Sequence, residues 1–155
     1  MISAASLAPR RSRSALFRVC KRIEIGIHHV ALICSDYQGS KHFYTQVLGL
    51  TVLAEHFRAE RQSWKLDLAL PDGSQLELFS FPSPPARPSR PEACGLRHLA
   101  FKVADMAAAV AHLTAAGVEV EPVRTDPYTQ RLFTFFTDPD GQPLELYQTP
   151  AETDC

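Results

Sequence analysis

The stretch LRHLAF (residues 96–101) repeats the residue types of an earlier stretch, IHHVAL (residues 27–32), in the same order. Each copy has a histidine at its third position, and the residues around it alternate as in a β-strand. An aspartate follows each histidine after seven residues, at Asp36 and Asp105, and a helical pattern that ends at a glycine comes next. This duplication predicts that the chain contains two copies of one module.

A second pair of matching stretches closes each copy. DGSQLELF (residues 72–79) is answered by DGQPLELY (residues 140–147), and a glutamate lies four residues after the glycine in both, at Glu77 and Glu145. The distance from the histidine to the glutamate is 48 residues in the first copy and 47 in the second. Each module therefore has a potential metal ligand on its first strand and another on its last strand.

The segments between these stretches predict one helix and two further strands in each module. Asp36 and Asp105 are suited to cap the helices, and alternating apolar residues indicate the strands. The expected fold class is α+β, with two paired βαβββ modules. The expected elements are strands at 26–35, 51–58, 63–70 and 75–81 with a helix from 37 to 48, and then, after the strand at 96–101, a helix between 105 and 117 and strands near 118–124, 131–137 and 143–148.

The modules are flanked and joined by segments of different composition. Residues 1–24 are rich in Ser, Ala and Arg and are expected to form a disordered basic tail. Five prolines mark residues 82–95 as a connector, because proline cannot donate a hydrogen bond to a sheet. We expect one domain, made of module 25–81, this connector and module 96–149, and then a short tail at 150–155.

Charge and composition argue against several classes of partner. Six of the 16 basic residues lie in the first 22, which contain no acid, so the rest of the chain carries ten basic against 17 acidic side chains. An acidic body without a basic stripe argues against nucleic acid, and no apolar run is long enough to span a membrane. The four scattered cysteines form no metal or redox motif and fit the reducing cytoplasm, which is the expected location.

Strand alternation places the four candidate ligands on equivalent faces. His29 and Glu77 point away from the face that the first helix covers, and His98 and Glu145 hold the matching positions in the second module. If the two sheets form one concave surface, two imidazoles and two carboxylates meet at its centre and suit a divalent ion of Zn, Ni, Co, Mn or Fe. The alternative is that each histidine is a satisfied core residue and each glutamate a surface charge, which requires four coincidences at once.

Three stretches resemble the vicinal oxygen chelate superfamily: IHHVALICSDYQGSKHFYTQVLGL, LRHLAF and DPDGQPLELY. This superfamily includes glyoxalase I, extradiol dioxygenases, fosfomycin-resistance enzymes and bleomycin-binding proteins. The match runs from about residue 25 to residue 148, and the His-Glu-His-Glu set is most similar to that of bacterial glyoxalase I. The resemblance implies the paired-module fold around an open metal site.

The resemblance to glyoxalase I also implies an activity, that of a metal-dependent lyase or isomerase acting on a small oxygenated substrate. In that family the metal holds both oxygens of an enediolate-type intermediate, and the second glutamate moves a proton. By this comparison His29, Glu77 and His98 are ligands, and Glu145 is both a ligand and the catalytic base.

The residues that would hold the rest of the substrate differ from those of glyoxalase I. The arginine and asparagine that bind glutathione there are replaced by Ile33 and Phe81, so glutathione dependence is not implied. Arg87 and Arg90 on the connector are cations that could hold an anionic substrate. Other candidates for substrate binding are Lys65, Asp67, Lys102 and Arg131.

Two further functions stay open within the same superfamily. An extradiol-type dioxygenase would use three protein ligands on Fe(II) and a longer chain, and a non-catalytic drug-binding protein would not need four ligand-type residues at matching positions. We expect a small-molecule substrate and no nucleic-acid or membrane partner. A homodimer is also open, with the site lying either within one chain or between two.

Overall fold

The computed structural model describes residues 25–150, which form two four-stranded sheets. The first module contains β1 (His29–Cys34), α1 (Tyr37–His42) and its continuation as a π-helix (Phe43–Val47), β2 (Thr51–Arg58), a 3-10 turn (Ala59–Arg61), β3 (Ser63–Ala69) and β4 (Gln75–Ser80). The second module contains β5 (Leu99–Val103), α2 (Met106–Ala115), β6 (Arg124–Thr125), β7 (Leu132–Thr137) and β8 (Pro143–Gln148). The tails predicted at 1–24 and 150–155 lie outside the described residues, apart from residue 150.

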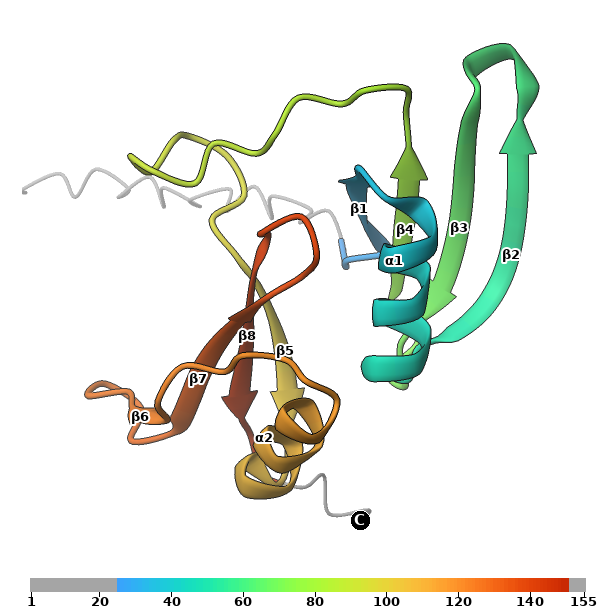
Figure 1. The fold of residues 1–155 in the computed structure, drawn as a ribbon. Coiled ribbons are helices and arrows are strands. Elements are labelled where there is room, and N and C mark those ends of the chain that lie inside the picture. The colour runs from blue at the N-terminus through green and yellow to red at the C-terminus, as the bar shows by residue number, and fades with distance from the viewer. Residues whose placement is uncertain (1–24, 151–155) are drawn as a thin grey trace, which may run out of the picture.

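Both sheets follow the same plan. The strand order is β1-β4-β3-β2 in the first and β5-β8-β7-β6 in the second, and β1 and β5 are the edge strands on the sides that face each other (Figure 1). In each sheet the first strand pairs in parallel with the last, and the other neighbours are antiparallel. The predicted α+β fold of two paired βαβββ modules is therefore confirmed.

One face of each sheet forms the core, as the alternation predicts. Leu32 and Cys34 are buried, whereas His29, Ala31 and Ile33 on the same strand are exposed. The buried apolar side chains of both modules belong to one cluster with the helices. The opposite faces of the two sheets are consequently left open. The largest fully buried apolar side chains are Tyr44, Leu66, Leu68, Leu76, Leu78 and Leu144.

The first helix begins and ends as its sequence indicates. The Asp36 side chain accepts hydrogen bonds from the backbone N–H groups of Gln38 and Gly39 at 3.1 and 3.2 Å. The helix ends before Gly49, whose φ of +74° is in the left-handed region that glycine adopts freely. No helix among residues 25–150 has the length and apolar character needed to cross a membrane.

The prediction of a strand near 118–124 is wrong for most of this range. Only Arg124–Thr125 pairs as a strand, with Leu132 and Phe133. Pro122 has no N–H group to donate to a ladder, which interrupts pairing just before β6. The first strand is also shorter than predicted, since β1 begins at His29.

Polar contacts join the two modules near the ends of α1 and β1. The Tyr44 hydroxyl donates to Asp138 Oδ2 at 2.9 Å, and both residues are buried. The Ser35 N–H donates to the Asp140 carboxylate at 3.1 Å. Burial raises the pKa of the Asp138 carboxyl, while hydrogen bonds, including that from Tyr44, act to lower it.

Replacing Tyr44 with phenylalanine should destabilise the protein, because it removes a donor from a buried carboxylate. We expect the free energy of unfolding to fall by about 1.5–3 kcal/mol, the range for a hydrogen bond to a charged group. Urea denaturation of both proteins measures the change. Tyr128→Phe is the matched control, since the Tyr128 side chain is exposed. A change below about 0.5 kcal/mol in Tyr44→Phe would show that the hydrogen bond contributes little.

Candidate metal centre

The first predicted ligand pair lies on the open face of the first sheet. His29 is the first residue of β1, and Glu77 is in the middle of the neighbouring β4. His29 Nε2 lies 3.7 Å from Glu77 Oε2, and the side chains are 41% and 15% exposed. His29 Nδ1 lies 2.9 Å from Nδ1 of His28, which restricts the orientation of the ring.

A lysine and an aspartate from β3 adjoin this pair. Lys65 Nζ lies 3.0 Å from Glu77 Oε1, and Lys65 also forms an ion pair with Asp67. Burial acts to lower the pKa of Lys65, but its hydrogen bonds with Asp67 and Glu77 outweigh this, so the pKa is raised and the lysine stays charged. The structure thus brings two of the predicted substrate-binding residues next to the first ligand pair.

In the second predicted pair, Glu145 is in β8, and His98 immediately precedes β5, which begins at Leu99, later than the strand predicted at 96–101. His98 Nε2 lies 3.1 Å from Glu145 Oε2, with side-chain exposures of 32% and 11%. The His98 ring packs edge to face against Phe135, with 5.2 Å between the ring centroids. Its Nδ1 is buried and has no hydrogen-bond partner within residues 25–150. Nε2 is therefore the ring nitrogen that faces the carboxylate.

The two pairs do not form one cluster in a single chain. Within the described part of the chain, no group of three or more His, Cys, Asp or Glu side chains is arranged to hold a metal ion. Strand alternation determines the face on which a residue lies, but it does not determine how one module packs on the other. The metal-binding role of His29, Glu77, His98 and Glu145 stays a prediction.

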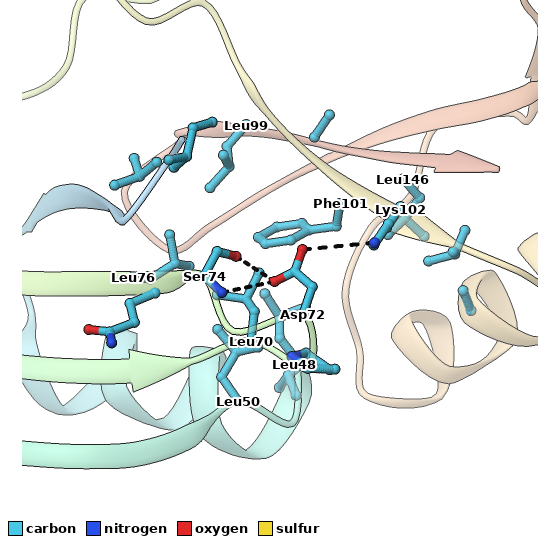
Figure 2. A pocket seen from close by; sticks show the side chains of 18 of the residues that line it. Leu48, Leu50, Leu70, Asp72, Ser74, Leu76, Leu99, Phe101, Lys102 and Leu146 are labelled. Carbon is cyan, nitrogen blue, oxygen red and sulfur yellow. Dashed lines mark hydrogen bonds and ion pairs between the residues drawn. The ribbon is translucent and has the colours of Figure 1, made fainter. Parts of the chain in front are cut away.

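The remaining substrate-binding candidates are placed elsewhere. Lys102 Nζ lies 4.0 Å from Asp72 Oδ2, and both residues line a cavity of about 980 Å³ between the modules (Figure 2). Most of this cavity is apolar, and none of the four predicted ligands lines it. Arg131 is exposed, and its side chain makes no hydrogen bond within residues 25–150. The cavity is therefore distinct from both ligand pairs.

A second cavity, of about 950 Å³, adjoins the second ligand pair. His98 and Phe135 line it together with residues of the proline-rich connector, among them Arg90 and Cys94. The connector therefore contributes to the surroundings of a predicted ligand.

Arg87 of the connector has a positioning role that the sequence did not reveal. Its Nη1 donates to Gln142 Oε1 at 2.7 Å, and its Nη2 donates to the backbone carbonyls of Leu96 and Arg97 at 3.1 and 3.2 Å. These carbonyls immediately precede His98. The Arg87 guanidinium, predicted as a possible anion-binding group, is thus engaged within the chain. Two of the three groups that accept hydrogen bonds from Arg87 are backbone carbonyls. Every residue has a backbone carbonyl, so a pattern of side chains in the sequence cannot identify these partners.

Replacing Arg87 with methionine should loosen the segment before His98. We expect the protein to lose about 1.5–3 kcal/mol of stability, because several acceptors lose a charged donor. Chemical denaturation measures this loss, and hydrogen exchange at the Leu99 amide should become faster. Arg90→Met is the control, since Arg90 lies on the same connector and is exposed. Equal stability of the two variants would contradict the role of Arg87.

The duplicated sheets and matched His–Glu pairs define a protein of the vicinal oxygen chelate class. The chain belongs to the Glyoxalase/Bleomycin resistance protein/Dioxygenase superfamily, whose family model matches residues 26–146. It is 62% identical over 122 residues to the uncharacterized protein YaeR of Escherichia coli (strain K12). The aligned region covers 79% of this chain and 95% of YaeR.

Two other similarities bear on the family and the fold. The crystal structure of a glyoxalase family protein from Enterococcus faecalis is 52% identical, with a TM-score of 0.75 over 79% of this chain and 96% of that one. A protein of Actinomyces sp. named 2-epi-5-epi-valiolone epimerase is 31% identical over 148 residues, covering 82% of this chain and 81% of its own. These comparisons establish the family and the fold.

Proposed function

We propose that this protein is a metal-dependent lyase or isomerase of the glyoxalase I type, which acts on a small oxygenated substrate through an enediolate-type intermediate. The proposal is carried by the repetition of one His–Glu pair on the open face of each sheet, His29 with Glu77 and His98 with Glu145. An isolated surface ion pair has no reason to recur at the matching position of a duplicated module. A four-ligand site with two ligands from each module accounts for this repetition.

The donor set fits a divalent cation. Two imidazoles and two carboxylates are common ligands of Zn, Ni, Co, Mn and Fe ions. With neutral imidazoles, the carboxylates of Glu77, Asp67 and Glu145 and the ammonium of Lys65 give the two half-sites a combined charge of −2. A divalent ion would neutralise this charge.

We infer that each complete site combines the first module of one copy with the second module of another. One chain supplies two ligands from each sheet and does not gather them into one group within its described residues. A twofold homodimer would create two equivalent composite sites. His29 and His98 are accessible to a second copy, because their side chains are 41% and 32% exposed.

The four side chains can have different roles in a proton transfer, as metal ligands or as the base. A divalent cation held by them would stabilise negative charge on the substrate oxygens while a proton leaves the neighbouring carbon. In this proposal Glu145 accepts the proton and returns it to the adjacent carbon. We assign this role to Glu145 because its only described ion-pair partner is His98, so no lysine among the described residues holds its carboxylate. Glu77 is held by the Lys65 ammonium and serves as a ligand.

The named activity of one relative agrees with this chemistry. The Actinomyces protein is named an epimerase. Inversion of a carbon next to a carbonyl begins with loss of a proton from that carbon, which is the abstraction assigned to Glu145, and it ends with a proton returning to the opposite face of the same carbon. The proposal therefore includes isomerases as well as lyases.

Metal analysis followed by a substrate screen tests the proposal. We expect purified protein to bind about one divalent ion per chain, as two composite sites in a dimer require. The screen uses adducts of α-ketoaldehydes with several thiols, together with catechols. Turnover of an adduct supports the proposal, whereas oxygen-dependent ring cleavage of a catechol identifies a dioxygenase. A protein that binds no divalent metal would contradict it.

A further inference from the structure

Arg58, at the end of β2, carries a charge that no carboxylate balances within residues 25–150. Its guanidinium carbon lies 4.8 Å from the centroid of the Phe79 ring and 5.7 Å from that of Phe81. Its Nη2 donates to Ser63 Oγ at 2.7 Å, whereas its buried Nε has no partner. Among residues 25–150 it forms no ion pair, although it is half-buried. A partly desolvated guanidinium without an anion is unfavourable.

The second module provides an internal comparison. Arg124 likewise packs on two aromatic rings, 5.0 Å from the centroid of Phe133 and 5.6 Å from that of Phe135. Arg124, however, forms an ion pair with Glu121, with 2.8 Å between Nη2 and Oε2. Each sheet therefore presents an arginine on phenylalanine rings. Of these two arginines, Arg58 is the one that has no carboxylate partner in the described part of the chain.

The unbalanced charge lies near the first ligand pair and on the same face of the sheet. Phe79 follows Glu77 by two residues on β4, which places its side chain roughly 7 Å further along the strand. Lys65 Nζ lies between them, 3.0 Å from Glu77 Oε1 and 5.8 Å from the Phe79 centroid. Lys65 is already paired with Asp67 and Glu77, whereas Arg58 has no anionic partner among the described residues and can pair with an incoming anion.

We propose that Arg58 binds an acidic group of the substrate, a carboxylate or a phosphate, at the end opposite the oxygens held at the metal centre. The planar guanidinium suits either group, since it can donate two parallel hydrogen bonds. This proposal rests on the proposed function for the metal-bound end of the substrate. It narrows the substrate class to small oxygenated anions and makes Arg58 a specificity-determining residue.

A matched pair of probes separates the two ends of such a ligand. 2-Oxoadipate and 2-oxohexanoate share the vicinal oxygens and the chain length, and they differ only in the distal carboxylate. Calorimetric titration of the wild-type protein should show about tenfold to hundredfold tighter binding of 2-oxoadipate, as expected for one charge-assisted contact. Arg58→Gln should lose this preference, Arg58→Lys should retain part of it, and Arg61→Gln, which changes a nearby exposed arginine, should keep it.

The outcomes distinguish this proposal from the metal site. Equal affinity of the wild type for the two acids, including no binding of either, would overturn the role of Arg58, as would an unchanged preference in Arg58→Gln. A purely structural role would lower the melting temperature of Arg58→Gln without changing the preference. The affinity of the wild-type protein for each acid is also measured with and without added divalent metal. If metal changes neither affinity, the proposed metal function fails, while the preference for the distal carboxylate still reports on Arg58.

Discussion

Replacing Glu145 with glutamine should leave metal bound and lower turnover by about 10²–10⁴, the range for loss of a general base. The amide keeps an oxygen that can face the ion, but it cannot accept the proton. Glu145 is the residue for this role because it is buried beside His98 and has no lysine partner within residues 25–150. The measurement is turnover of the substrate found in the screen, with metal content determined on the same samples.

Glu77→Gln is the matched comparison for this prediction. Glu77 occupies the equivalent position of the first module and is paired with Lys65, so its replacement should affect metal affinity more than proton transfer. A fully active Glu145→Gln together with an inactive Glu77→Gln would reverse the two roles. Incorporation of solvent deuterium next to the former carbonyl carbon would support proton abstraction, and its absence under exchange conditions would favour a hydride shift.

Alanine at His29 or His98 should remove most of the bound divalent metal and lower the metal affinity on the order of a hundredfold or more. Loss of a residue that only hydrogen-bonds to a metal ligand already lowers metal affinity about 10–100-fold, and loss of a ligand should cost at least as much. The melting temperature should fall as well, because metal at a hundredfold excess over Kd contributes about 2.7 kcal/mol to stability. The controls are alanine at His42, which is exposed on α1, and at His112, which contacts the Val47 carbonyl. Equal metal content in all four variants would reject the assignment.

Mixing the two ligand variants tests whether the site lies between copies. Consider a dimer of one His29→Ala chain and one His98→Ala chain. If the sites are shared between copies, one of the two sites contains both substitutions and the other contains none. Such a mixed dimer, isolated with two different tags, should therefore hold about half of the wild-type metal. A site within each chain would be damaged in both copies, and the mixed dimer would hold almost none.

Features that depend on local periodicity could be predicted from the sequence. Alternation along β1 and β4 placed His29 and Glu77 on one open face, and the repeat placed His98 and Glu145 likewise. The same alternation on β3 brought Lys65 towards Glu77. In these strands the burial of one face determines the direction of every second side chain.

Features that depend on packing between distant segments could not be predicted in this way. The sequence pattern was compatible with four ligands meeting in one chain, but the packing of the modules involves contacts such as that between Tyr44 and Asp138. The role of Arg87 depends on backbone carbonyls, which every residue has. The unpaired charge of Arg58 can be recognised only from its surroundings, which contain no ion-pair partner among residues 25–150.

The parallel pairing of β1 with β4 has a consequence for the order of folding. Strands β2, β3 and β4 are joined by short turns, whereas His29 pairs with Gln75, 46 residues along the chain. Closing a long loop costs more entropy than closing a short one, so we expect the antiparallel strands to assemble first and β1 to dock onto them. The same order applies to β5 and β8, where Leu99 pairs with Leu144. Each His–Glu pair is then completed by the late strand, and a metal ion would bind to a finished sheet rather than guide its formation.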